Sequence, residues 1–185
     1  MAIEEPKFTV ESRTAHYEIR KYASMLVAET TIEADFDKAG NQGFRILADY
    51  IFGNNRSKTK IAMTAPVTQQ APSEKVAMTA PVSQIQVPGG FLVQFTMPAS
   101  FTLASLPEPN DARVHLREVP ARRVAVHVYT GSWSEAHYQQ RLNEFLTALK
   151  NDAVQTKGKP VFARFNSPFQ LWFLRRNEIW IELAP

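Results

Sequence analysis

The sequence predicts an α+β fold with a mostly antiparallel β-sheet and two helices. Three observations support this prediction: short segments rich in β-forming residues, two longer segments with apolar residues at helical spacing, and an internal repeat that gives each half of the chain one helix. The chain has 185 residues, of which 44% are hydrophobic and 21% charged, so it can bury a core of its own. We expect one domain over residues 1–185, with internal halves at about 8–105 and 112–185.

The first half is predicted to start with two strands and a helix. Residues 17–31 are rich in β-forming side chains and partly alternate, which indicates two strands with a break near their middle. Residues 35–53 carry apolar side chains at helical spacing, with Asp35 placed to cap the helix and Gly53 placed just after its end. Residues 91–98 are expected to form a later strand.

A short repeat lies between this helix and the later strand. The segment KIAMTAPV at residues 60–67 returns as KVAMTAPV at residues 75–82, with a polar, turn-prone spacer between the copies. Side-chain alternation, with a proline near the end of each copy, predicts two matching strands joined as a hairpin. A chemical alternative stays open, in which Met63 and Met78 present thioethers to one ligand instead of filling gaps in the core.

The second half is predicted to repeat the same order of elements. Ser132 and Glu135 have the S-x-x-E spacing of a capping box, in which each residue satisfies a free backbone N–H at the start of a helix. The expected elements are two strands within residues 114–131, a helix within 132–152, and closing strands at 160–166 and 178–183.

An offset of 97 residues aligns the two halves. It pairs Arg20 with Arg117 and Val27 with Val124, both within predicted strands. We therefore expect two β-β-α-β-β-like units packed about a pseudo-twofold axis.

Composition excludes several kinds of site. The chain has no cysteine, so it cannot form disulfides, thiolate zinc sites or covalent c-type haem attachments. The opening residues lack the apolar centre of a signal peptide, and no apolar run approaches the roughly 20 residues that span a bilayer. The net charge is only +3 and the basic residues are scattered, unlike those of most nucleic-acid binders. We expect a cytoplasmic protein that binds neither nucleic acid nor membranes.

Catalytic motifs are absent from the sequence. There is no G-x-S-x-G elbow, no cysteine nucleophile, no complete phosphate-binding loop and no HExxH pair. These absences favour a non-catalytic protein.

The last 25 residues are unusually aromatic. Some of these rings are expected in the core, while others could line an apolar cleft for a flat ligand, with Arg175 and Arg176 at its rim. The aromatic residues are Phe162, Phe165, Phe169, Trp172, Phe173 and Trp180.

Four segments together resemble the SOUL family of haem-binding proteins. They are YEIRKY at residues 17–22, YIFGNN at 50–55, KIAMTAPV at 60–67 and RRNEIW at 175–180, and the repeated AMTAPV is similar to the bacterial branch. The resemblance covers nearly the whole chain. It implies a distorted antiparallel β-barrel flanked by two helices, an architecture shared with GyrI-like effector-binding domains. It also implies that haem or another tetrapyrrole binds non-covalently in an exposed apolar cleft beside the first helix.

Carried over residue by residue, the resemblance implies a protein that buffers or carries haem in the cytoplasm. Some members carry a histidine after YEIR as the proposed iron ligand, and this chain has Lys21 there, so haem would bind weakly or its iron would use another ligand such as His127 or His137. The implied cleft residues lie on the first helix, in the AMTAPV segment and near the end of the chain, and they are Asn41, Phe44, Arg45, Ala48, Met63, Leu171 and Trp172.

Two other functions stay open. One is a small-molecule sensor or hydrolase like the GyrI-like relatives, which would keep a buried acid in its pocket, with Glu118 and Glu178 as candidates. The other is a protein-interaction module that needs no ligand, because a fold alone does not determine a function.

Overall fold

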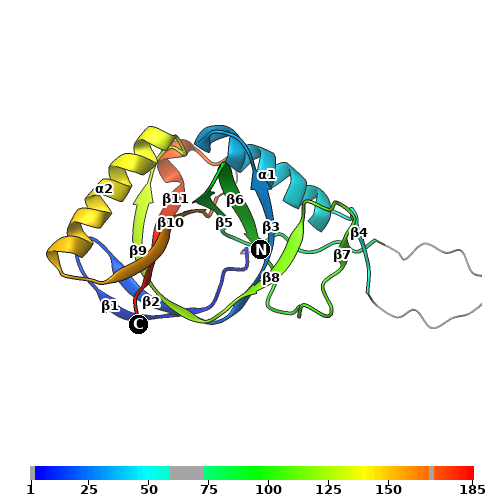
Figure 1. Ribbon diagram of the computed structural model, residues 1–185, viewed down its shortest axis with the longest axis horizontal. Coiled ribbons are helices and arrows are strands. Elements are labelled where there is room, and N and C mark those ends of the chain that lie inside the picture. Colours follow the sequence, from blue (N-terminus) through cyan, green and yellow to red (C-terminus); the bar gives the residue numbers. More distant parts are fainter. Residues whose placement is uncertain (1–2, 59–72, 167–168) are drawn as a thin grey trace, which may run out of the picture.

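A computed structural model describes residues 3–58, 73–166 and 169–185. In this part of the chain the fold consists of a large antiparallel sheet, a two-stranded sheet, two α-helices and a short 3-10 helix, η1 (Figure 1). The elements are, in chain order, β1 (Phe8–Arg13), β2 (Glu18–Tyr22), β3 (Met25–Ile32), α1 (Phe36–Ile51), β4 (Asn55–Arg56), β5 (Val82–Val87), β6 (Gly90–Thr96), β7 (Glu108–Pro109), β8 (His115–Val119), β9 (Arg122–Thr130), α2 (Glu135–Asn151), β10 (Thr156–Arg164), η1 (Trp172–Leu174) and β11 (Arg176–Leu183).

The strand order of the large sheet shows the predicted symmetry. It runs β1-β2-β9-β11-β10-β5-β6-β3-β8. The two halves of the chain are β2-β3-α1-β5-β6 and β8-β9-α2-β10-β11. If β1 is left out and each strand is replaced by its counterpart in the other half, the same strand order results, read from the opposite edge of the sheet. The offset of 97 places β2 on β8 from end to end and the start of β3 on the start of β9. The pseudo-twofold α+β fold is therefore confirmed, while the stated boundaries of the halves stay a prediction.

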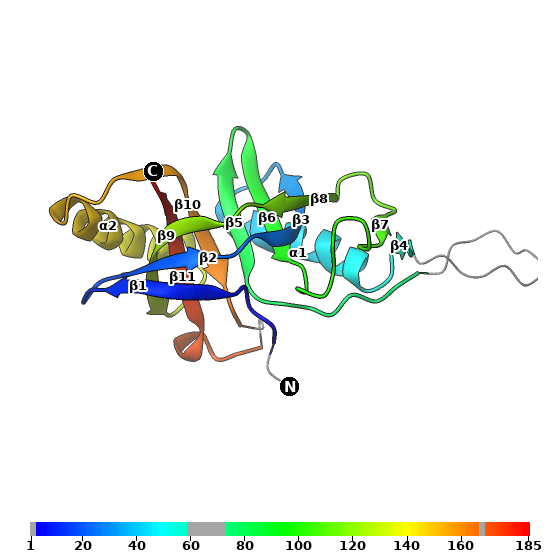
Figure 2. The same cartoon turned by 90° about the horizontal axis from the view of Figure 1, so that it is seen from below.

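Strands of each half pair with strands of the other half, and the resulting sheet is curled. β2 leads directly into β3, and β8 leads directly into β9. β2 pairs with β9 while β3 pairs with β8, with Tyr22 opposite Arg122 and Met25 opposite Val119. The two continuous runs thus cross the molecule antiparallel to each other (Figure 2), and the sheet closes into a curled half-barrel.

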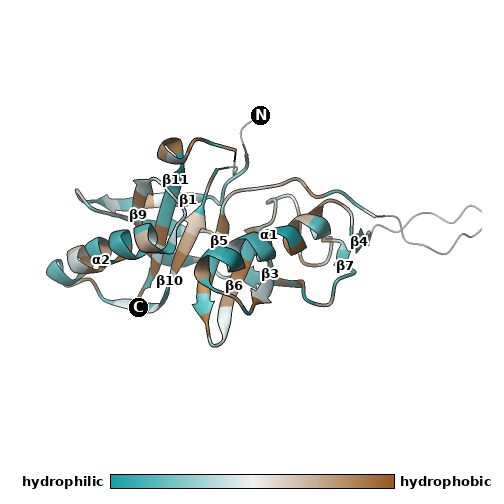
Figure 3. Cartoon of the chain, turned by 90° about the horizontal axis from the view of Figure 1, so that it is seen from above, coloured by the Kyte–Doolittle hydropathy of each residue, from teal (hydrophilic) through white to brown (hydrophobic). Residues whose placement is uncertain are grey.

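Both helices cover the same face of this sheet (Figures 1 and 3). Phe145 belongs to an apolar cluster under α2, and Leu47 belongs to a second cluster under α1. A third cluster around Trp180 and Val124 lies on the opposite face, since neighbouring side chains of a strand point to opposite sides. Neither helix of the described residues combines the length and hydrophobicity that crossing a bilayer requires.

The start and the end of α1 lie where the sequence predicts them. The carboxylate of Asp35 accepts a hydrogen bond from the backbone N–H of Lys38 (3.0 Å). Gly53 follows the helix with a φ of +128°, a conformation that a side chain would strain.

The predicted capping box of α2 is wrong. The helix begins at Glu135, and its cap is Ser134, whose hydroxyl accepts from the backbone N–H of His137 (3.4 Å). Ser132 lies two residues before the cap, too early to bond the first turn, and its hydroxyl instead bonds the hydroxyl of Ser134 (3.0 Å).

The predicted hairpin of the two AMTAPV copies is not what the second copy forms. The first copy lies outside the described residues, and in the second copy only Val82 belongs to a strand. The backbone N–H of Ala80 bonds the carbonyl of Glu4 (2.9 Å), and the hydroxyl of Thr79 bonds the carbonyl of Thr96. These partners replace a strand ladder, and β5 instead forms its hairpin with β6.

Candidate functional site

The predicted cleft residues of α1 do not share one surface. Asn41 and Arg45 are exposed, whereas Ala48 is buried. Phe44 is half-buried, and its ring lies 5.3 Å from the ring of Phe95 on β6. Two of the four side chains are therefore open to a ligand from solvent, and the other two also support the core.

The other two described cleft residues belong to a stretch of exposed apolar side chains, which we name the apolar segment (residues 169–174). Phe169 is 96% exposed and Trp172 is 60% exposed, and Leu171, Phe173 and Leu174 are also exposed. Figure 3 shows the short helix before β11 in brown, the colour of hydrophobic residues. A contiguous patch of this kind marks an interaction site more often than isolated surface hydrophobes do.

The apolar segment is tied to the loop that precedes α2. η1 packs against β9, and the Nε–H of Arg175 donates to the carbonyl of Gln170 (2.9 Å). The guanidinium of Arg175 lies 4.1 Å from the centre of the Trp133 ring. The indole N–H of Trp133 in turn donates to the side-chain oxygen of Asn177 (2.8 Å), which fixes the ring.

Trp133 also lines a cavity of about 260 Å³ between the first turns of the two helices, which we name the interhelical cavity. The side chain of Asp37 on α1 accepts from the backbone N–H of Glu135 on α2 (3.1 Å), so the two helix starts are joined. The ring of Phe36 stacks on that of Tyr138 (5.0 Å). The lining residues are Phe36, Asp37, Asn41, Gln84, Trp133, Ser134, Phe162 and Arg164. Asn41 is the one predicted cleft residue, among those the structure describes, that lines it.

Arg164 is the charged group of this cavity that sequence reasoning missed. It is only 9% exposed, and its guanidinium carbon lies 5.1 Å from the centre of the Trp133 ring. Burial, and next the charge of Arg175, lowers the pKa of Arg164 to about 10, so it stays positive at neutral pH. One signal was available, because Arg164 lies two residues after the buried Phe162 and therefore shares its side of the strand.

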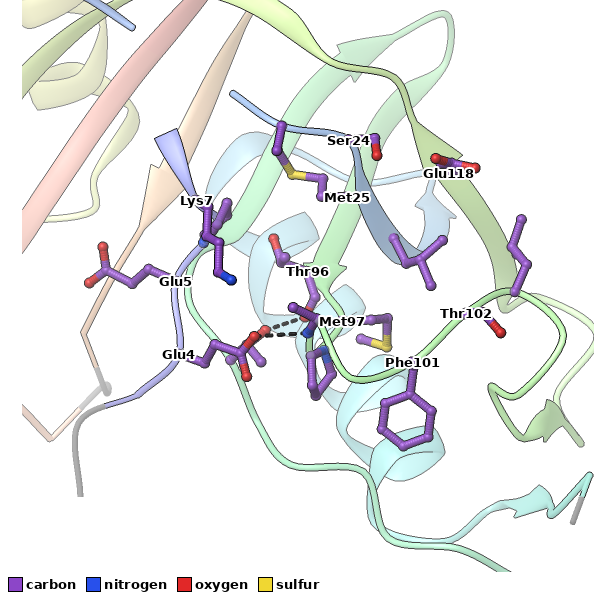
Figure 4. Close-up of a pocket in the computed structure, with 17 residues that line it drawn as sticks. Glu4, Glu5, Lys7, Ser24, Met25, Thr96, Met97, Phe101, Thr102 and Glu118 are labelled. Carbon is purple, nitrogen blue, oxygen red and sulfur yellow. Dashed lines mark hydrogen bonds between the residues drawn. The ribbon is translucent and has the colours of Figure 1, made fainter. Parts of the chain in front are cut away.

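A second cavity, of about 310 Å³, lies between the N-terminal segment, the start of β3 and the segment after β6 (Figure 4). Its wall combines Met25, Met97 and Phe101 with acidic side chains and Lys7. The carboxylate of Glu4 accepts from the backbone N–H of Ala99 (2.8 Å). None of the described cleft residues lines it.

The two acids predicted for a sensor or hydrolase have different environments. Glu118 is exposed at the edge of the second cavity. Glu178 is fully buried, and its carboxylate is bonded by Arg20 (3.1 Å), Arg176 (2.7 Å) and the indole of Trp180 (2.6 Å). The ion pairs and hydrogen bonds already made by Glu178 indicate a structural role.

The two predicted axial ligands lie in the second half of the fold. The Nδ1–H of His127 donates to the carbonyl of His16 (2.7 Å), and its ring stacks on Phe145 (5.6 Å). The Nε2–H of His137 donates to the carbonyl of Thr130 (3.1 Å). Within the described ranges, no three His, Asp or Glu side chains gather as a metal site would require.

Of the two methionines that could present thioethers to one ligand, the described residues include Met78, whose side chain is exposed. Met63 lies outside the described residues, so its predicted place in the cleft stays a prediction.

The comparisons with known proteins agree with this fold. The family model described as SOUL heme-binding protein matches residues 3–182. Heme-binding protein 2 of Homo sapiens is 30% identical over 172 residues, which cover 89% of this chain and 77% of that protein.

Among solved structures, the C-terminal domain of EcmrR matches with a TM-score of 0.61 at 8% identity, over 92% of this chain and 99% of that one. A hydrolase from Listeria innocua matches with a TM-score of 0.58 at 12% identity, over 94% of each chain. At such identities the likeness shows the fold alone.

Proposed function

The chain belongs to the SOUL heme-binding protein family, and from this premise we propose that it binds haem or a related tetrapyrrole non-covalently. We propose further that it carries or buffers the ligand in the cytoplasm and catalyses no reaction. The observation that supports this proposal best is the apolar segment, which exposes five large apolar side chains next to Arg175, whose guanidinium lies over Trp133 in the loop before α2.

The chemistry of these residues fits a tetrapyrrole. The macrocycle is flat and apolar, and covering it stabilises a complex by roughly 25 cal/mol per Å² of apolar area. The interhelical cavity, at about 260 Å³, is smaller than the roughly 300–1,000 Å³ of pockets that enclose drug-sized ligands. The ring would therefore lie mainly against the apolar segment and the exposed face of α1.

Charged residues suited to the acidic edge of the ligand are also present. Arg45 is exposed on α1, and Arg175 lies at the boundary between the apolar segment and Trp133. Each guanidinium could meet a propionate through a charge-assisted hydrogen bond. Haem would supply a redox-active iron, for which His127 and His137 remain the predicted protein ligands.

A hemin titration tests this proposal, followed by the Soret absorption of the complex. We expect saturable one-to-one binding by the wild-type chain and at least a tenfold loss of affinity in Trp172→Glu, because the charge would replace an exposed apolar contact. The matched control is Leu146→Glu on α2, since Leu146 is also an exposed apolar residue (41%) but belongs to another surface.

Both variants change exposed side chains, so both are expected to fold, which circular dichroism would verify. Equal loss of affinity in the two variants would place hemin elsewhere than on the apolar segment. A wild-type titration that never saturates would reject haem as the ligand.

A further inference from the structure

We propose that the interhelical cavity is a carboxylate-binding site, in which Arg164 meets the acid group and the rings of Trp133 and Phe162 pack beside the body that carries it. The acid could belong to a free aromatic monocarboxylate or to the propionate edge of a tetrapyrrole. The site itself does not depend on which of the two supplies the carboxylate.

Arg164 differs from the other deeply buried arginine of the fold. Arg20 is also buried, but it forms ion pairs with Glu178 (3.1 Å) and Glu18 (2.7 Å). No described carboxylate pairs with Arg164, whose guanidinium instead lies near the rings of Trp133 (5.1 Å) and Phe162 (6.0 Å). A buried charge without a counter-ion opposes folding, and a bound anion would remove that penalty.

The surrounding residues hold the guanidinium in the cavity wall. Gly40 of α1 leaves the space it occupies, because a Cβ there would collide with the Nη2 of Arg164 and would lie 2.7 Å from the side-chain oxygen of Gln84. The amide of Gln84 is itself fixed, since its Nε2–H donates to the carbonyl of Phe36 (3.0 Å). A glycine, a buried amide and an unpaired arginine therefore meet at one point of the cavity.

The electrostatic surroundings favour an anion. The cavity lies at the N-terminal turns of both α1 and α2, the positive ends of the helix dipoles. Arg175 adds a second positive charge near the cavity, since its guanidinium lies 4.1 Å from the centre of the Trp133 ring. Among the described residues that line the cavity, Asp37 is the one with a carboxylate, and this carboxylate accepts from the backbone N–H of Glu135.

The size of the cavity selects the class of ligand. Its volume of about 260 Å³ lies just below the roughly 300–1,000 Å³ of pockets that bind drug-sized ligands. This volume accommodates a single ring with a carboxylate but not a whole macrocycle. Aromatic walls made by Phe36, Trp133 and Phe162 suit a planar body.

Benzoate is a suitable probe because it contains only these two parts. We would titrate it into the purified full chain and follow the indole N–H signal of Trp133 by ¹⁵N-resolved NMR. We expect a saturable shift with the wild type. The affinity for benzoate should be at least tenfold lower in Arg164→Met, because a charge-assisted hydrogen bond is lost while the buried volume is kept. The control is Arg122→Met, since burial also lowers the pKa of Arg122 but its side chain faces Glu182 (3.8 Å).

Thermal unfolding gives a second readout. Without ligand, Arg164→Met should melt at a higher temperature than the wild type, because the unpaired charge is gone. Benzoate should raise the melting temperature of the wild type and leave that of the variant unchanged. Equal benzoate affinity in both proteins, or no saturable shift of Trp133, would overturn the proposal.

Competition identifies the source of the acid. If hemin displaces benzoate while hemin dimethyl ester, which lacks free carboxylates, does not, then the site receives a propionate. If neither displaces it, the site serves a free aromatic acid. Because benzoate binding is measured without haem, a failed hemin titration and a failed benzoate titration reject different proposals.

Discussion

At the scale of single residues, the buried charged side chains have two kinds of environment, one with ionic partners and one without. Glu178 is fully buried at the centre of a network in which Arg20, Arg176 and Trp180 all donate to its carboxylate. Arg164 has no such partner among the described residues. The first arrangement fixes strands to one another, while the second leaves a charge available to a ligand.

Replacing Glu178 with glutamine tests the structural role of this network. Arg20 would lose its fully buried counter-charge, so we expect the free energy of unfolding to fall by about 3 kcal/mol or more. Urea unfolding measures the change. Glu182→Gln is the control on the same strand, since its partly exposed ion pairs with Lys157 and Arg122 are worth about 1 kcal/mol or less. Similar losses in both variants would show that the network contributes no more than a surface pair.

At the scale of elements, α1 carries two glycines whose missing side chains have different purposes. A Cβ at Gly43 would lie 2.6 Å from the Cβ of Val93, which is fully buried on β6. The three atoms nearest to a Cβ at Gly40 all belong to the ends of two long side chains, those of Gln84 and Arg164. Gly43 therefore allows the helix to approach the sheet, whereas Gly40 makes room for the side chains of Gln84 and Arg164, which line the cavity.

Alanine substitutions at Gly40 and Gly43 test these two roles separately. We expect Gly43→Ala to lower the free energy of unfolding by about 1–3 kcal/mol through overpacking. Gly40→Ala should lower the free energy of unfolding less than Gly43→Ala does, because alanine gains up to about 1 kcal/mol in a helix and the side chains that must shift are long, and it should weaken benzoate binding by displacing Arg164. Urea unfolding and the Trp133 titration measure the two effects. A Gly40→Ala variant that is destabilised more than Gly43→Ala and has unchanged benzoate affinity would reverse the assignment.

Elements with a clear periodicity could be predicted from the sequence. The two helices and the strand pairs β2-β3 and β8-β9 have apolar side chains at the spacing that their burial requires. β1 was missed because nearly all of its residues are exposed, so it carries no pattern of burial. The strand expected for the second AMTAPV copy was wrong because the backbone N–H of Ala80 bonds the N-terminal segment and only Val82 of this copy belongs to a strand.

At the scale of the whole molecule, the sequence predicted the repeat but not how the two copies combine. Side-chain alternation tells which face of a strand is buried, but it does not tell which strand lies next to it. The pairing of β2 with β9 and of β3 with β8 therefore appears only in the assembled sheet. The interhelical cavity has the same origin, because Asn41, Trp133 and Arg164 are distant in sequence and meet only when both helices lie on one face.

The tyrosines give the assembled fold a predictable response to alkaline pH. Burial raises the pKa of all five, Tyr17, Tyr22, Tyr50, Tyr129 and Tyr138, and it reaches about 12 for Tyr17, Tyr22 and Tyr138, against 10.0 when they are exposed. Between pH 10 and 12 the unfolded chain loses these protons and the folded chain keeps them, so the folded state loses stability as the pH rises. The lowered pKa values of Arg122 and Arg164 act in the opposite direction, but they are two groups against five.

We therefore expect the free energy of unfolding to fall steeply above pH 10, at about 1.4 kcal/mol for each proton and pH unit. Urea unfolding at a series of alkaline pH values measures the slope. Tyr138→Phe is the informative variant, because burial alone raises the pKa of Tyr138 and phenylalanine keeps its ring. Its slope should be smaller than that of the wild type by the contribution of one tyrosine. A free energy of unfolding that stays constant from pH 10 to 12 would mean that the tyrosines are not shielded from water as this sheet and its helices arrange them.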